Sequence, residues 1–143
     1  MDRQDYLDLI KQGVQVWNTW RSEHPDDFPD LSYADLSEID LSEINLANTK
    51  LDHAILFQTF LLRANLANAS LIETDAREAK LLMTNLRAAN LSNADLTDAV
   101  VTGADITDVI VTGALLPPRF KKMLDSHLPH SPHIQACDRE TST

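Results

Sequence analysis

The sequence is poor in cysteine, glycine and long apolar runs. Its 143 residues include one cysteine, Cys137, and three glycines. A single cysteine excludes an internal disulfide and fits a reducing compartment. No apolar run reaches eighteen residues and the chain has no basic-then-apolar start, so we expect neither a membrane span nor a secretory signal, and a cytoplasmic location. A glycine-rich phosphate-binding loop is also missing.

Positive charge is scarce as well. Twelve lysine and arginine residues stand against 22 aspartate and glutamate residues, which gives a net charge of −10. Direct binding of DNA or RNA requires a basic surface against the phosphates, so the charge balance argues against a nucleic-acid partner. The simplest interpretation of the acidic surface is that it keeps a repetitive β structure soluble.

What the sequence does contain is a repeat of five residues. From Leu31 to Leu116 a large aliphatic residue occupies every fifth position, with Ala76 as the exception. Alanine or threonine usually stands two residues earlier, and Asp or Asn often stands immediately before the large residue. A period of five fits neither a helix nor a long strand. Each unit must therefore form a short extended side and a turn, and successive turns must stack to bury the apolar residues.

The pattern A-(D/N)-L-x-x resembles that of the pentapeptide repeat family, as in Ala34-Asp35-Leu36-Ser37, Ala64-Asn65-Leu66-Ala67-Asn68 and Ala94-Asp95-Leu96-Thr97-Asp98. The resemblance implies an all-β solenoid, namely a right-handed quadrilateral parallel β-helix with four units per coil. The repeats would then make roughly four and a half coils and a rod about 22 Å long. The segment Val16-Trp17-Asn18-Thr19-Trp20-Arg21 and the acidic linker after it resemble the leader of many cyanobacterial members.

The chain divides into three predicted parts. Residues 1–28 should form a capping helix, from Asp2 to about Glu23, and a linker; residues 29–118 the β-helix; and residues 119–143 a short helix and a disordered tail. A helix at the start would cover the open edge of the first coil, which could otherwise pair with another chain.

The clearest departure from polar outward positions lies in the second coil. Ile55, Phe57, Phe60 and Leu62 take outward positions in the repeat. Because residues twenty apart should stack, Leu82 is expected over Leu62, and Lys80 and then Val100 over Phe60. The predicted outward apolar patch contains Ile55, Phe57, Phe60, Leu62, Leu82, Met83 and Val100. Large apolar patches mark interfaces, and the alternative is that the C-terminal tail or self-association covers this one.

Residues suited to catalysis or metal binding do not form a recognisable group. His127, His130, His133 and Cys137 cluster near the C-terminus, but their spacing is interrupted by prolines and matches no structural zinc site. A nucleophile, a base and an orienting residue cannot be grouped. We therefore expect neither an enzyme nor a bound cofactor or metal.

Two binding hypotheses remain. The first is a non-catalytic protein-interaction scaffold, which uses the apolar patch to bind an unknown protein, with neither nucleic acid nor membrane as a partner. The second follows from the resemblance, because some pentapeptide repeat proteins inhibit or protect DNA gyrase as acidic mimics of DNA. Outward acids such as Asp35, Glu73 and Asp95 fit this hypothesis, but lysine and arginine interrupt them. The rod is also short for a mimic of duplex DNA. A homodimer through the C-terminal helix, as in that subgroup, would double its length.

Overall fold

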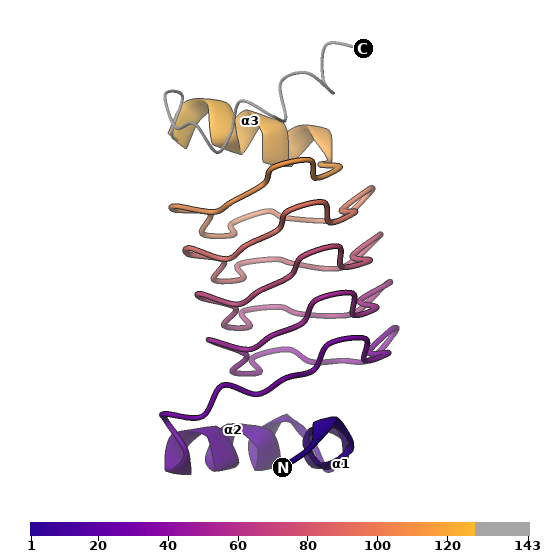
Figure 1. The fold of residues 1–143 in the computed structure, drawn as a ribbon. Helices are drawn as coiled ribbons and strands as arrows, with labels where there is room; N and C mark the ends of the chain where they lie inside the picture. The colour runs from indigo at the N-terminus through magenta and orange to yellow at the C-terminus, as the bar shows by residue number, and fades with distance from the viewer. Residues whose placement is uncertain (128–143) are drawn as a thin grey trace.

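The computed structural model describes residues 1–127 and shows a rod with helices at both ends (Figure 1). Helices α1 (Arg3–Lys11) and α2 (Val14–Glu23) lie at one end, and α3 (Pro118–His127) lies at the other. The predicted disordered tail begins beyond this range and lies outside the described residues. Within residues 1–127, no helix has both the length and the apolar composition needed to cross a membrane.

Parallel backbone bridges between residues twenty apart build the rod. They begin with Asp30 and Lys50 and continue to Asp95 and Leu115, so four five-residue units make one coil. The large aliphatic residue after each bridge position points inward, and Leu51 for example has no exposed surface. The stacking interval of twenty residues that the family resemblance implied is therefore the one that the backbone adopts.

Every turn of the rod contains a residue with a left-handed backbone. The φ angle is 65° at Tyr33 and 59° at Asp108, and nearly all units between them are similar. Residues other than glycine adopt this backbone region at an energetic cost. The Asp or Asn before the leucine offsets the cost by accepting a backbone N–H two residues on. Asp35 Oδ1 thus lies 3.0 Å from the nitrogen of Ser37.

These turn aspartates should make the stability of the fold depend on pH. Hydrogen bonds from Ser37 hold the pKa of Asp35 below its ordinary value, and Ser42 and Thr107 do the same for Asp40 and Asp105. A carboxylate whose pKa is lowered by folding stabilises the protein above its unfolded pKa, and this contribution is lost as the pH falls through its folded pKa. We expect the urea midpoint to fall as the pH drops below about 4.

Asparagine makes the same turn without a titratable proton, since Asn45 Oδ1 accepts from the nitrogen of Ala47 at 3.1 Å. The triple variant D35N/D40N/D105N should therefore lose much of the acid sensitivity while keeping its stability at pH 7. A matched control, E38Q/D98N/D108N, removes three charges from turn residues whose carboxylates accept no hydrogen bond within residues 1–127. Equal pH profiles for the two variants would show that overall charge, and not the turns, governs acid unfolding.

Threonine replaces alanine at several inward positions and remains hydrogen-bonded there. Thr59 and Thr84 have no exposed surface. Their hydroxyl groups donate to the carbonyl oxygens of Leu36 at 2.7 Å and of Leu61 at 2.8 Å, both in the preceding coil. These hydroxyl groups can therefore be buried in the interior, because each donates a hydrogen bond to a backbone carbonyl oxygen.

The N-terminal segment forms two helices, so the prediction of one helix from Asp2 to Glu23 was wrong. Asp2 does begin α1, in a capping box with Asp5. Gly13 then breaks the segment with a φ of 120°, a conformation open mainly to glycine. The apolar spacing from Ile10 to Val14 is helical across this break, which is why the hydrophobic pattern did not reveal it.

Helix α2 supplies polar partners to the open edge of the first coil. In later coils, the N–H of a residue placed like Asn45 bonds to the coil below, as Asn65 does to Ile44. Asn45 has no such coil, and α2 takes its place: Trp17 Nε1 donates to the Asn45 oxygen at 2.7 Å, and Asn18 Oδ1 accepts from the Asn45 nitrogen at 2.7 Å. The edge is thus closed by hydrogen bonds as well as by apolar cover.

Arg21 extends this closure to the linker. Its guanidinium is buried, with the residue 5% exposed, and it donates to the carbonyl oxygens of Asp27 at 3.0 Å and Ala47 at 2.5 Å. Burial lowers the pKa of Arg21. The buried arginine therefore ties α2, the linker and the first coil together.

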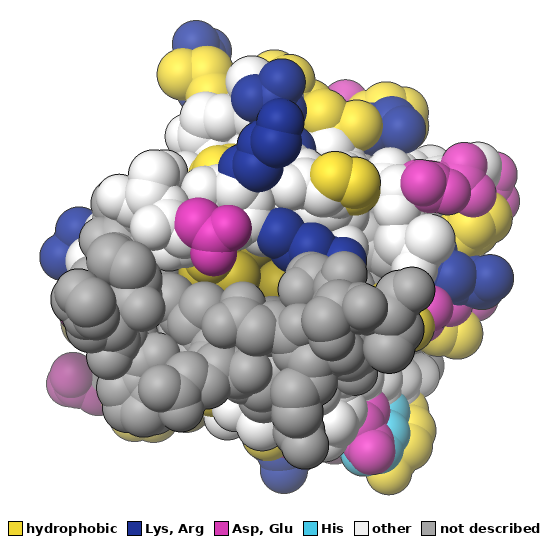
Figure 2. Space-filling model, turned by 90° about the horizontal axis from the view of Figure 1, so that it is seen from above, with side chains coloured by type: hydrophobic (Ala, Val, Ile, Leu, Met, Phe, Trp, Pro, Cys, Tyr) yellow, Lys and Arg dark blue, Asp and Glu magenta, His cyan; other side chains and the backbone are white. Residues whose placement is uncertain are grey.

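Helix α3 lies over the last coil. Phe120 and Leu124 are buried, and Leu116 at the end of the repeats is buried with them. The exposed side of α3 carries basic residues, and Figure 2 shows lysine and arginine side chains exposed at this end of the rod. The sequence placed the end of this helix near Leu128, and α3 ends at His127.

Candidate protein-interaction surface

Five of the seven predicted patch residues lie at neighbouring positions in three successive coils. Bridges join Phe60 to Lys80 and Lys80 to Val100, so these residues form a column on one face of the rod. Leu62 and Leu82 occupy the adjoining corner one coil apart, because the nitrogen of the next residue, Arg63, bonds to the Leu82 oxygen at 2.9 Å. We use the name apolar patch for the residues Phe60, Leu62, Leu82, Met83 and Val100.

The apolar patch is accessible. Phe60 is 46% exposed, Leu62 38% and Met83 52%, whereas Leu82 and Val100 are half-buried. Gly103 sits above Met83, and a Cβ atom at Gly103 would lie 3.1 Å from Met83 Cγ. The glycine therefore leaves room for the methionine side chain at the upper edge of the patch.

The remaining two predicted residues lie apart from this surface. Ile55 is 37% exposed but belongs to the neighbouring face, where bridges place it between Asp35 and Asp75. Phe57 occupies the corner between the two faces and is half-buried. The guanidinium of Arg77 lies 5.0 Å from the centre of the Phe57 ring. The structure thus narrows the predicted patch, because an arginine one coil above covers Phe57.

Two cations lie at the apolar patch, and neither has a partner within the described residues. Arg63 is exposed beside Leu62, and Lys80 lies half-buried between Phe60 and Val100. Within residues 1–127, neither side chain forms an ion pair or a hydrogen bond. The ion pairs found there join His53 to Glu73, Arg77 to Asp75, and Arg87 to Asp105. The patch therefore combines exposed apolar side chains with two positive charges, Lys80 within the column of Phe60 and Val100 and Arg63 at the adjoining corner.

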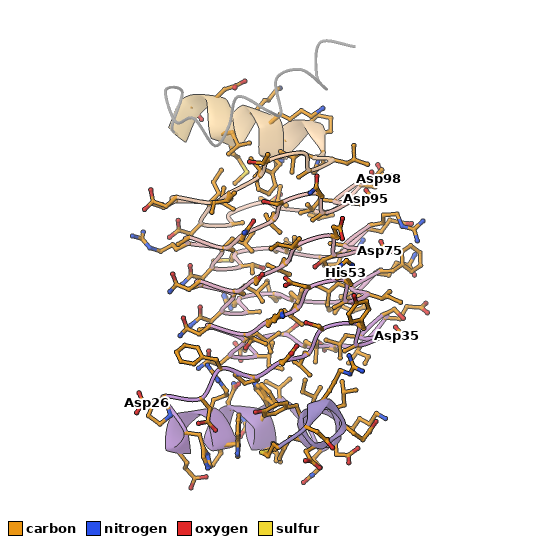
Figure 3. All side chains as sticks on the ribbon, in the orientation of Figure 1. Asp26, Asp35, His53, Asp75, Asp95 and Asp98 are labelled. Atoms are coloured by element: carbon orange, nitrogen blue, oxygen red, sulfur yellow. The ribbon has the colours of Figure 1, made fainter. Side chains whose placement is uncertain are left out.

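Acidic side chains gather on another side of the rod. Figure 3 shows four of them along this side: Asp35, Asp75, Asp95 and Asp98. Arg77 interrupts the row by donating two hydrogen bonds of 2.9 Å to the Asp75 carboxylate. These hydrogen bonds lower the pKa of Asp75 and raise that of Arg77. The row of negative charge on this side is therefore interrupted twice: Arg77 neutralises Asp75, and the uncharged Ile55 lies one coil below.

His53 takes part in contacts between neighbouring corners of the rod. His53 stacks on Tyr33, with ring centres 4.7 Å apart, and its Nε2 lies 3.2 Å from a carboxylate oxygen of Glu73. These contacts join stacked corners of the rod. Within residues 1–127, no group of three histidine, cysteine or acidic residues could hold a metal ion. The His and Cys residues of the tail that were considered for zinc lie outside the described residues, apart from His127 at the end of α3.

Sequence reasoning missed one surface feature, a groove between α1 and α2. It has a volume of about 410 Å³ and is lined by Leu9, Val16, Trp20 and Glu23, among others. The groove exists because the chain breaks at Gly13. The prediction of one continuous helix therefore left no place for it. Gly13 was the signal in the sequence that could have indicated it.

Comparison with known proteins identifies the repeat. The family model for pentapeptide repeats matches residues 30–61, 44–81 and 84–116. HetL of the cyanobacterium Nostoc sp. strain PCC 7120, a pentapeptide repeat protein involved in heterocyst differentiation regulation, is 37% identical with a TM-score of 0.60. The match covers 62% of this chain and 41% of HetL, so the chain spans less than half the length of this relative.

Two further solved structures are less similar. The pentapeptide repeat protein alr5209 from Nostoc PCC 7120 is 20% identical, with a TM-score of 0.48, over 70% of this chain and 94% of its own. A pentapeptide repeat protein from the Arabidopsis thaliana thylakoid lumen is 25% identical, with a TM-score of 0.40, over 73% of this chain and 79% of its own. No curated protein matches the sequence.

The matched segments together span residues 30–81 and 84–116, which is more than half of the 143 residues. They coincide with the part of the chain in which bridges join residues twenty apart. The chain therefore belongs to the pentapeptide repeat family, whose fold is the right-handed quadrilateral β-helix.

Proposed function

We propose that this protein is a non-catalytic interaction scaffold that binds a protein partner through the apolar patch. The observation that carries the proposal is the exposure of Phe60, Leu62 and Met83, each more than a third exposed, at neighbouring positions in two successive coils of the rod. Removal of such side chains from water on binding is favourable, and interfaces draw much of their energy from a few large apolar or aromatic anchors.

The rod also holds these anchors in place before binding. Leu61 N bonds to the Lys80 oxygen at 2.8 Å, and Leu81 N bonds to the Val100 oxygen at 2.6 Å. The backbone under the patch is therefore fixed by the coil above. A preorganised surface loses less conformational entropy when a partner binds.

The similarity to HetL supports a role in regulation through binding. HetL is involved in the regulation of heterocyst differentiation, and its matched segment is the same kind of repeat rod. We further infer a cytoplasmic location and a β-helix of roughly four and a half coils. A homodimer through α3 is less favoured, because Arg119, Lys121 and Lys122 would approach their copies in a two-fold interface.

The charge pattern favours the scaffold over an acidic DNA mimic. A mimic of duplex DNA needs an unbroken row of negative charge, but Arg77 neutralises Asp75 and Ile55 stands in the same column. A DNA mimic would affect gyrase supercoiling without requiring Phe60 or Leu62. The supercoiling assay on wild-type protein and on a patch variant therefore separates the two hypotheses.

The scaffold is tested by truncating the patch. The double variant F60S/L62S should capture its partner from a host extract at least about tenfold less than the wild-type protein, because two exposed anchors are lost. Quantitative mass spectrometry of the captured proteins measures the effect. Ile55→Ser is the matched control, since it removes an equally exposed apolar side chain from the neighbouring face. Undiminished capture by a folded F60S/L62S variant would contradict the proposal.

A further inference from the structure

Along the column of the apolar patch, the backbone N–H and C=O groups of Phe60, Lys80 and Val100 are all hydrogen-bonded within the rod. Phe60 N donates to the oxygen of Ile39 at 3.0 Å, and the Phe60 oxygen accepts from Leu41 N at 2.7 Å. Lys80 N likewise donates to the oxygen of Thr59 at 2.9 Å. A partner strand could therefore not add itself to this side by main-chain hydrogen bonds. A segment that docks here must satisfy its own backbone, and an α-helix does so.

The apolar side chains recur at a spacing that suits a helix. Phe60 and Leu62 lie in one coil, Leu82 and Met83 in the next, and Val100 in the one after. Stacked strands are about 4.8 Å apart. One turn of an α-helix rises about 5.4 Å, and side chains at i, i+3 or i+4, and i+7 lie on one face. About two turns of helix, lying along the rod, would place an apolar side chain at each of the three levels.

The charged residues beside the apolar patch determine which side chains a docked helix should carry on its flank. Arg63 and Lys80 border the patch at its first two levels, and neither has a partner within residues 1–127. The coil below carries Asp40 and Glu43 in the same two columns. Acidic side chains on a docked helix would therefore be attracted to the level of Arg63 and Lys80 and repelled further toward the N-terminal end of the rod.

We infer that the partner contributes an amphipathic α-helix with an acidic flank, which lies along the rod over the apolar patch. The inference rests on the proposed scaffold function and adds the class of segment that the patch accepts. The covered surface comprises Phe60, Leu62, Leu82, Met83 and Val100, and the acidic flank of the helix pairs with Arg63 and Lys80.

A peptide selection tests the inference without knowledge of the partner. A displayed library of random peptides of about 16 residues, long enough for about four helical turns, is selected on the full-length protein and depleted on the F60S/L62S variant. Enriched peptides should carry apolar residues at i, i+3 or i+4, and i+7, with an excess of Asp and Glu. Synthetic copies should gain helical circular dichroism when they bind.

The charge variants supply the matched comparison. For the R63E/K80E variant, the acidic peptides should bind at least about tenfold more weakly, and selection should instead enrich basic helices. The milder R63Q/K80Q variant, which adds no repulsion, should weaken binding without this inversion. Thermal unfolding of each variant verifies that the rod is intact.

Three results would overturn the inference: peptides with alternating or proline-rich patterns, peptides with a basic excess on the wild-type protein, or no enrichment at all. If capture of the host partner still depends on Phe60 and Leu62 in that case, the scaffold function stands and only the helical acidic partner is wrong. If capture is unchanged in F60S/L62S, the scaffold function itself fails.

Discussion

Replacement of Trp17 by alanine should lower the free energy of unfolding by about 3 to 5 kcal/mol, the largest loss that we expect from a single change at the N-terminal end. Trp17 has no exposed surface and packs against Tyr6 and Trp20, with ring centres 6.2 and 5.4 Å away. Its indole also satisfies the oxygen of Asn45 on the open edge of the first coil. The change thus removes core packing and leaves a backbone acceptor without its partner.

Two further substitutions separate these contributions. Val16→Ala, next to Trp17 but at a position 39% exposed, should cost less than about 1 kcal/mol. Trp17→Phe keeps much of the ring and loses the hydrogen bond, so its cost should lie between the other two. Urea unfolding followed by circular dichroism measures all three. A loss for Trp17→Ala no larger than that for Val16→Ala would show that α2 does not stabilise the rod.

The effect of Trp17→Ala should also be confined in space. Each coil of a solenoid contacts only its neighbours, so damage at one end spreads weakly to the other. Amide hydrogen exchange should accelerate most in residues 31–50 and least near α3. This pattern would distinguish local fraying of the first coil from a uniform loss of stability.

The repeat was predictable because its period leaves one solution for the core. A large apolar residue stands at every fifth position, as at Leu51 and Leu71, and it can be buried only if each unit turns it inward and successive coils stack. Which outward side chains meet was less predictable. The interval of twenty aligns Phe57 with Arg77, but the sequence does not specify the rotamer that places the guanidinium over the ring.

The ends of the rod were the least predictable part, because no repeat constrains them. In the N-terminal segment, Ile10 and Trp17 stand at helical spacing in the sequence, and both are buried. It could not show that Arg21 would be buried, since arginine usually lies at the surface. The arginine is inside because the first coil presents carbonyl oxygens that no coil below can pair, as at Ala47. Such polar closure depends on tertiary contacts that the local pattern does not contain.

Phe120→Ala should cost about 3 to 5 kcal/mol at the opposite end of the rod. Phe120 has no exposed surface, and it lies with Leu124 and Leu116 in the apolar cluster beneath α3. Truncation leaves a cavity under the helix and weakens its hold on the last coil. Arg119→Ala is the matched control, because it changes an exposed residue of the same helix and should alter stability by less than about 1 kcal/mol.

Loss of α3 contacts should also change the association state. The last bridges join Asn90 to Ile110 and Asp95 to Leu115, so within residues 1–127 no coil follows to cover the backbone above them. An uncovered strand edge pairs readily with another chain. We therefore expect Phe120→Ala to accelerate hydrogen exchange in residues 101–116 and to increase self-association measured by sedimentation. Trp17→Ala should accelerate exchange at the other end, and identical exchange patterns for the two variants would contradict independent closure of the two ends.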